Sequence, residues 1–379
     1  MTSKASGEAT AQSGGAIQPQ PHQRNPSSKQ RRKGPLSDQI LDFAARASGV
    51  GIVLLLVALL VVLTNAAWPS IKANGFGFLT GTTWRVNELE RPQRDSAGKI
   101  VYDANDEMVM IIEPAVYGAA PVIYGTVISS AIALVLAVPL SLGAALFLVR
   151  IAPRWRVAAP VAFFIEFLAA IPSLAYGVWG IFVLVPFMGK VVGPAAKASL
   201  GEIPLFDWLF FRTLNVGGQN TRYEITINGW NMLTGATVLA IMILPIITAI
   251  SRDVLRAVPR QQIEATLALG ATWWQSSWMM LRYARAGLFG AIILGLARAA
   301  GETMAVTMVI GNKNQIVASF FEPAQTMASL LATEFAEAKP DQRSSLLHVA
   351  LVLLIISLGI NILARWLVVG SASKGSAGH

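Results

Sequence analysis

The stretch that decides the fold runs from Gln261 to Asn312 and reads QQIEATLALGATWWQSSWMMLRYARAGLFGAIILGLARAAGETMAVTMVIGN. Its first half cannot cross a membrane, because Gly270 interrupts it early and many charges lie in it or just before it, namely Arg256, Arg260, Glu264, Arg282 and Arg285. Its second half, at about 288–310, is apolar and long enough for a hydrocarbon core of about 30 Å, which needs roughly 20 helical residues. The sequence therefore predicts a helix at the membrane surface that leads into a spanning helix.

Two charges lie inside the apolar second half. Arg298 and Glu302 stand four residues apart, which places them on one face of a helix and close enough to pair. A charge at the bilayer centre costs roughly 3 kcal/mol, so it requires a partner, a water-filled cavity or a function. We predict a buried ion pair that serves the passage of a charged solute; the alternative is a structural pair that only orders the helices.

The composition is that of an integral membrane protein. The chain has 379 residues, of which 54% are hydrophobic and 13% are charged, whereas soluble domains carry about 25% charged residues. The net charge of +9 does not indicate nucleic-acid binding, because the basic residues lie between apolar segments, where they determine topology. Cysteine is absent and only three histidines occur, so we expect no disulfide and no metal site.

Six apolar segments predict an all-α fold with six transmembrane helices. They lie at about 49–70, 123–149, 158–188, 232–250, 288–310 and 346–369. The loops after the second and fourth segments are rich in Arg and Lys, whereas those after the first, third and fifth are mixed in charge. By the positive-inside bias, we expect both termini in the cytoplasm.

The segments between the spans complete the predicted domain plan. The parts are a disordered cytoplasmic tail (1–35), an interfacial helix with the first span (36–71), an extracytoplasmic insertion (72–116), a five-helix core (117–370) and a cytoplasmic tail (371–379). Within the core we expect extracytoplasmic loops at 189–230 and 312–345 and a cytoplasmic coupling loop at 252–285.

Two hairpins are predicted in the outer loops. The first pairs residues 99–102 with 108–112 through the turn at 103–106, and the second covers 213–227 around two consecutive glycines.

Several polar side chains within the spans are candidates for the wall of a translocation pathway. They are Ser129, Ser130, Glu166, Ser173 and Tyr176. Small hydroxyl residues on one helix face suit close helix packing equally well. For Glu166, the alternative is a position near the cytoplasmic interface or a bond to the backbone.

The predicted surface helix is a candidate docking element. It follows a basic turn, contains Glu264 and Ala265, and ends at Gly270 between two spans. Such an element is placed to dock in a groove of another protein; a connector that merely lies on the membrane is the alternative.

These residues resemble known families. The string EAT at 264–266 with Gly270 resembles the EAA loop of ATP-binding-cassette (ABC) importer permeases, in which this loop is the coupling helix on the ATPase subunit. The strings RAAGETMAV at 298–306, IGN at 310–312, PLSLG at 139–143 and EFLAAIPSLAYGVWG at 166–180 resemble the phosphate-specific permeases of PstC type. The resemblance covers about 117–366.

The resemblance implies a fold, a function and partners. The fold would be that of type I (MetI-like) importer permeases in a bacterial plasma membrane. The chain would be a permease, not an enzyme, of an ATP-driven phosphate importer. Its partners would be inorganic phosphate, membrane lipid, a second (PstA-like) permease, two (PstB-like) ATPases and a (PstS-like) phosphate-binding protein. ATP and Mg would be used by the ATPases, and this chain would bind no cofactor.

The resemblance also assigns residues. Arg298, Glu302 and Thr303 would act in translocation, with Arg298 contacting phosphate and Glu302 holding Arg298 while the site is empty. Arg260, Glu264, Ala265 and Gly270 would couple to the ATPase. The sequence departs from the pattern at Thr266, which replaces the second Ala, and at Arg282-Tyr283, where Leu-Pro usually closes the loop.

Other functions remain open on the sequence. The P-loop pattern GxxxxGK[ST] is absent, so the chain does not bind ATP through such a loop. A permease for sulfate or molybdate is the nearest alternative. A secondary transporter or channel without an ATPase, and a membrane-anchored scaffold or sensor, are the alternatives from other classes.

Overall fold

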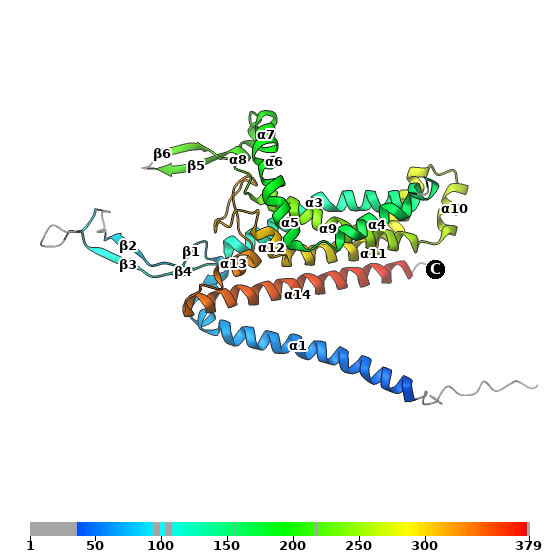
Figure 1. The fold of residues 1–379 in the computed structure, drawn as a ribbon, viewed down its shortest axis with the longest axis horizontal. Helices are drawn as coiled ribbons and strands as arrows, with labels where there is room; N and C mark the ends of the chain where they lie inside the picture. The colour runs from blue at the N-terminus through cyan, green and yellow to red at the C-terminus, as the bar shows by residue number, and fades with distance from the viewer. Residues whose placement is uncertain (1–35, 94–98, 103–107, 156, 217–218, 377–379) are drawn as a thin grey trace, which may run out of the picture. The chain divides into compact units, whose positions relative to one another are not determined.

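The computed structural model describes residues 36–93, 99–102, 108–155, 157–216 and 219–376. The predicted tail 1–35, the first hairpin's turn, the two consecutive glycines and residues 377–379 therefore lie outside the described part. The α-helices are α1 (Leu36–Asn74), α2 (Gly77–Thr80), α3 (Ala120–Leu146), α4 (Ala158–Ala169), α5 (Ser173–Trp179), α6 (Val185–Phe187), α7 (Gly193–Leu200), α8 (Asp207–Phe210), α9 (Met232–Arg256), α10 (Arg260–Ala268), α11 (Trp273–Gly301), α12 (Met304–Thr307), α13 (Met327–Glu334) and α14 (Pro340–Ser376) (Figure 1).

Within the described residues, six helical segments are long and apolar enough to cross a membrane. They are Ile40–Asn74, Ala120–Ile151, Ser173–Leu200, Met232–Arg256, Trp273–Gly301 and Pro340–Ile362. The predicted all-α class with six spans is therefore confirmed. By its internal contacts the chain divides into residues 1–57 and 58–379. The first unit contributes the start of α1, and the core and sites described below belong to the second.

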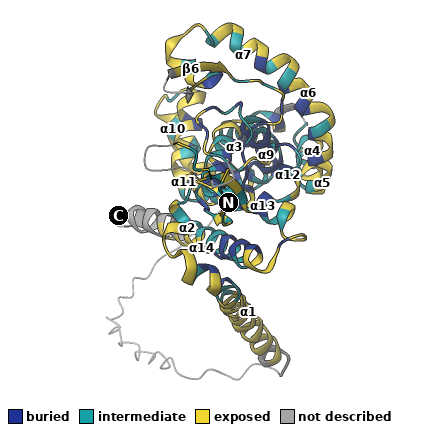
Figure 2. Cartoon of the chain, turned by 90° about the vertical axis from the view of Figure 1, so that its left-hand side faces the viewer, coloured by how far each residue is buried: buried dark blue, intermediate teal, exposed yellow. Residues whose placement is uncertain are grey.

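The core of the second unit surrounds α9. This helix packs against α3 and α11, and 61% of its most apolar stretch of residues is buried. Figure 2 shows buried residues concentrated on α3 and α9. Large apolar side chains of α9, including Leu239, Ile243 and Ile247, are almost fully buried. α9 is therefore buried on most faces. It runs from the loops at one end of the bundle to those at the other.

One end of the bundle carries three two-stranded antiparallel sheets, and we call it the hairpin end. β1 (Trp84–Arg85) pairs with β4 (Val116–Tyr117), β2 (Leu89–Pro92) with β3 (Met110–Glu113), and β5 (Phe211–Val216) with β6 (Gln219–Glu224). The hairpin expected at 213–227 is confirmed with shifted bounds. The first expected hairpin is confirmed only in part. Residues 99–102 meet 108–112 at the antiparallel bridge of Tyr102 with Met108 and where the Val109 N–H donates to the Val101 carbonyl at 3.0 Å, whereas β3 itself pairs with β2.

A loop from another part of the chain caps the start of α9. The backbone N–H groups of Met232 and Leu233 donate to the carbonyls of Glu322 and Phe320, at 3.1 and 2.9 Å. The Asn231 side chain accepts from the N–H of Thr234 at 2.9 Å as an N-cap. The first turn of α9 thus depends on the 319–322 loop for its otherwise unsatisfied donors.

The third span differs from its prediction. We expected one helix at 158–188, but α4 ends at Ala169 and a new helical segment begins at Ser173 and reaches Leu200 through π-helical turns. Pro172 causes the break, because proline disfavours the helical conformation of the residue before it. Consequently the loop predicted at 189–230 begins about 11 residues later, after Leu200.

The first, fifth and sixth spans also have different bounds. α1 is continuous, so the predicted interfacial helix and first span form one helix to Asn74. α11 starts at Trp273, so residues 273–285, which we assigned to the coupling loop, are its first turns. It ends at Gly301 rather than near 310. α14 continues to Ser376, into the predicted C-terminal tail.

At the other end of the bundle, a tight turn separates α10 from α11. Gly270 has a φ of +83°, and the N–H of Ala271 bonds back to the carbonyl of Thr266 at 3.1 Å. This 6→1 bond and the left-handed glycine form a Schellman-type C-cap. Thr272 and Gln275 then form a capping box that starts α11. Gly270 therefore sets where the surface helix ends.

Candidate functional site

Two broken helices meet in the middle of the second unit. α11 ends at Gly301, and α12 follows after two residues; the third span is broken between α4 and α5. α5 and α12 lie in contact, and a Cβ built on Gly177 of α5 would lie 2.6 Å from Met308 Sδ and 3.1 Å from Ala305 Cα. Broken helices at membrane depth occur where the backbone is buried in protein or lines a cavity, and in transporters they form substrate sites.

Arg298 lies on the last turn of α11, next to this junction. Its residue surface is exposed, and within the described part of the chain it makes no ion pair or side-chain hydrogen bond. The predicted pair with Glu302 is therefore not formed here, because α11 ends before Glu302 and the helical spacing of four residues does not apply.

Glu302 and Thr303 occupy the connection between α11 and α12. The Glu302 carboxylate accepts the backbone N–H of Ala305 at 3.3 Å, so it caps α12. The Thr303 hydroxyl donates to the Gly301 carbonyl at 3.3 Å. Both residues are partly exposed. The structure thus brings Arg298, Glu302 and Thr303 to one helix break, while their role in translocation stays a prediction.

Tyr176 closes the other break. Its hydroxyl donates to the Leu168 carbonyl of α4 at 2.7 Å, and its residue is 7% exposed. Beside it lies an apolar cavity of about 390 Å³, lined by Leu168, Ile171, Ala175, Tyr176, Trp179 and Ile241. Ser173, partly exposed, begins α5 one turn before Tyr176.

The two candidate serines of α3 are buried in a packed part of the structure. Ser129 and Ser130 are 0% and 2% exposed, and the Ser129 hydroxyl donates to the Thr126 carbonyl at 3.3 Å. The Thr126 hydroxyl accepts the N–H of Met327 at 2.9 Å, and a Cβ on Gly125 would lie 2.0 Å from the Gln325 carbonyl oxygen. This part of α3 packs tightly against the start of α13, an arrangement that favours the packing interpretation.

Glu166 has a partner that the sequence did not indicate. Its carboxylate lies 2.9 Å from Nη1 of Arg252, a residue of α9. Arg252 also donates from Nε to Asp253 at 3.0 Å. The sequence holds no signal for this contact, because the two residues are 86 positions apart.

The predicted coupling residues share one exposed helix. Arg260, Glu264 and Ala265 lie on α10, Gly270 lies in the turn after it, and all four are exposed. Ile263 holds α10 on the rest of the chain, because it packs against the apolar cluster that contains Leu255, Val258 and Met280. The apolar side chains of Leu267 and Leu269 are 45% and 89% exposed. α10 therefore presents a mixed polar and apolar surface, and its opposite side is packed on the rest of the chain.

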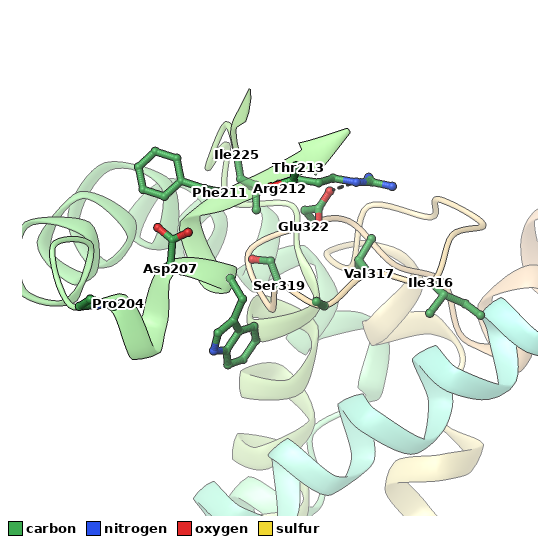
Figure 3. A pocket seen from close by; sticks show the side chains of 12 residues that line it. Pro204, Asp207, Phe211, Arg212, Thr213, Ile225, Ile316, Val317, Ser319 and Glu322 are labelled. Atoms are coloured by element: carbon green, nitrogen blue, oxygen red, sulfur yellow. Dashed lines mark hydrogen bonds and ion pairs between the residues drawn. The ribbon is translucent and has the colours of Figure 1, made fainter. Parts of the chain in front are cut away.

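A polar cavity of about 440 Å³ lies at the hairpin end (Figure 3). It is lined by Pro204, by residues of α8 and β5, by Ile225 directly after β6, and by the loop 316–322. The side chains of Arg212 and Glu322 meet at its edge, with 3.2 Å between Nη1 and Oε1. Glu322 is also a residue whose backbone caps α9, so this cavity is connected to the central helix.

In the described ranges, no group of three or more His, Asp or Glu side chains could hold a metal ion.

Comparisons with known proteins place the chain in a family. Residues 137–370 match the model of the binding-protein-dependent transport system inner membrane component family. A phosphate transport system permease protein PstC from Mesorhizobium japonicum is 37% identical over 339 residues, covering 89% of this chain and 91% of the relative. One from Pasteurella multocida is 37% identical, with coverages of 87% and 91%. One from Xylella fastidiosa is 42% identical, with coverages of 68% and 76%.

A solved structure is similar at lower identity. A chain of the MetNI methionine ABC transporter in an inward-facing conformation aligns with a TM-score of 0.43 and 17% identity, covering 65% of this chain and 90% of the other.

Six apolar helices, an exposed helix between two of them, and the family match together define a multi-pass permease component of a binding-protein-dependent transport system in the inner membrane. Within this class, the chain belongs to the family of phosphate transport system permease proteins PstC. This membership agrees with the expectation of a permease rather than an enzyme, and it implies ATPase and binding-protein partners.

Proposed function

We propose that the chain forms half of the phosphate pathway of an ATP-driven importer, with Arg298 as the fixed cation of that pathway. The observation that carries the proposal is the unpaired, exposed guanidinium at a break between two apolar helices. Phosphate is an anion near neutral pH, and its passage across an apolar barrier requires a compensating charge. Arg offers this charge at all pH values, with a planar fork of donors that fits phosphate oxygens.

Glu302 acts as the counter-charge of the empty site. In the described conformation its carboxylate is bound to the N–H of Ala305, which leaves Arg298 open to an anion. If α11 lengthened by one residue, Glu302 would stand at helical i+4 from Arg298, where the two charges can pair. Thr303, the next residue, would add a hydroxyl at the same break. Two arrangements of one short segment would thus hold or release the cation.

The outer and inner ends of the chain receive different partners. α10 docks in the ATPase subunit through the surface of Arg260, Glu264 and Ala265, and the polar cavity at the hairpin end faces the phosphate-binding protein. A PstA-like second permease completes the pathway, with two PstB-like ATPases and a PstS-like binding protein. ATP and Mg are used by the ATPases. In this arrangement both termini are cytoplasmic, as the positive-inside bias indicates.

The test is uptake of labelled phosphate by vesicles that hold the complete complex. We expect uptake that requires ATP and the binding protein and that excess sulfate or molybdate does not reduce. Uptake reduced equally by sulfate would assign another oxyanion. Uptake that persists without the ATPase subunits would assign a secondary transporter.

A further inference from the structure

The ion pair between Arg252 and Glu166 lies where it can transmit movement from one helix to another. It joins two helices that are far apart in sequence, with 2.9 Å between Nη1 and Oε1. The Arg252 side chain is only 11% exposed, whereas that of Glu166 is 55% exposed. Asp253 holds the Nε side of the same guanidinium at 3.0 Å. The guanidinium is thus fixed on α9, and Glu166 is the group that it can hold or release.

Within this chain, α4 makes few buried contacts. None of its residues is buried, and Phe163, Phe164 and Phe167 are 63%, 64% and 59% exposed. Its packing is mainly on α9. Because the Glu166 side chain is 55% exposed, the pair should add little to stability.

The α9 side of the ion pair leads to the coupling helix. Arg252 lies one turn before the end of α9, and Leu255 in the next turn packs with Ile263 of α10 in one apolar cluster. The backbone N–H of Ala257 returns to the Asp253 carbonyl at 3.1 Å. A displacement of α10 therefore moves the turn that carries Arg252.

The α4 side leads to the helix break. Two residues after Glu166, the Leu168 carbonyl accepts the Tyr176 hydroxyl at 2.7 Å. A series of contacts thus leads from α10 through α9 and α4 to Tyr176 at the helix break. Among the residues described, the Arg252–Glu166 ion pair is the polar side-chain contact that joins α9 to α4 in this series.

We infer that Arg252 and Glu166 are positioning residues that transmit the movement of the coupling helix to α4 and the break at Pro172. The inference rests on the proposed function, since it concerns how ATP hydrolysis is linked to transport. With the pair intact, α4 follows α9 and the Tyr176 region changes together with α10. With the pair broken, the ATPase still turns over while α4 no longer follows. Contiguity alone does not prove coupling, so a direct test of non-additivity is required.

The test uses the complete complex in vesicles, with phosphate uptake and ATP hydrolysis measured in the same sample. The variants are Arg252→Gln, Glu166→Gln, the double variant and the charge-conserving Arg252→Lys. Arg46→Gln is the control, because it also breaks an Arg–carboxylate pair, with Asp42, but one that lies within one turn of α1 and joins no two helices. Co-purification of the four kinds of subunit reports assembly.

We expect each single Gln variant to lower the phosphate transported per ATP hydrolysed by about 10-fold, in the range of typical coupling between sites. The double variant should lower it no further, because both singles break the same contact. Arg252→Lys should retain most of the ratio, and Arg46→Gln all of it.

Three outcomes would overturn the inference. The first is a native ratio in the single variants, including the case in which only assembly or thermal stability falls, since the pair would then be structural. The second is losses that add in the double variant. The third is ATP-independent uptake by the native complex, which would refute the proposed function itself and is seen before any variant is made.

Discussion

Two arginine–glutamate couples in this chain differ in a way that their sequences do not suggest. Arg298 and Glu302 are four residues apart and unpaired, and the arginine is exposed. Arg252 and Glu166 are 86 residues apart and paired at 2.9 Å, with the arginine almost buried. The first couple lies at a helix break in the middle of the bundle, and the second near the α10 end.

The difference shows what sets the state of a charge in a membrane helix. Proximity in sequence gives a pair only where the helix continues through both residues, and α11 ends one residue before Glu302. A fixed cation without a partner is costly in an apolar environment. An unpaired arginine of this kind fits the proposed role of Arg298 in the pathway, whereas the satisfied pair at the α10 end fits the inferred connection between helices.

The largest expected effect is the loss of the open cation. Arg298→Ala should reduce phosphate uptake at least about 100-fold while the complex still assembles, because two charge-assisted hydrogen bonds are each worth about 1.5–3 kcal/mol. Arg298→Lys keeps the charge but loses the fork, so it should retain more activity. Labelled uptake with co-purification measures both. Normal uptake in both variants would make Arg298 structural.

A second prediction gives Arg298 the partner that it lacks. Leu294 lies four residues earlier on the continuous part of α11 and is 51% exposed. Leu294→Glu should place a carboxylate in pairing distance and reduce uptake by about 10-fold, since the anion must compete with it. Leu294→Gln is the matched control. Equal uptake in the two variants would show that the open state of Arg298 is not required.

A smaller effect concerns Glu302 in its observed position. Because its carboxylate caps the Ala305 N–H, Glu302→Ala should lower the stability of the complex by about 1 kcal/mol, as the loss of a helix cap does. Glu302→Gln keeps an acceptor and should unfold at nearly the native temperature. Thermal unfolding of the purified complex measures both. Equal melting of the Ala and Gln variants would contradict the capping role.

The smallest effect calibrates what a paired arginine contributes at a surface. Arg222 pairs with Asp207 at the hairpin end, and both side chains are largely exposed. Arg222→Gln should change stability by less than about 1 kcal/mol. Thermal unfolding of Arg222→Gln beside Arg252→Gln makes the comparison. A larger loss at Arg222 than at Arg252 would remove the distinction between the two kinds of pair.

The spans were predictable because length and apolar composition decide them. The positions of Arg298 on its helix and of Glu264 on an exposed helix were predictable for the same local reasons. The break at Gly301 was not, because no proline follows it before residue 310 and the sequence there could continue a helix; in the structure the next segment, α12, instead packs on α5. The contact of Glu166 with Arg252 depends on how α4 packs on α9, which no local pattern records.

The hairpins show the same limit on a smaller scale. The pairing of β5 with β6 was predictable, because only two residues separate the strands in the sequence and so short a connection fixes the register. For β3, the apolar run at 108–112 indicated a strand but not that it pairs with residues 89–92. Pairing between strands that are not joined by a short turn needs the tertiary structure.

The loop 319–322 has a consequence for engineering this protein. It reads as a surface connector, where insertions are usually tolerated, yet its carbonyls complete the first turn of the most buried helix. An epitope tag placed between Ser319 and Pro323 should therefore break the hydrogen bonds at the start of α9 and destabilise that helix. Deuterium exchange at the amides of Met232 and Leu233 would report the opening of that loop.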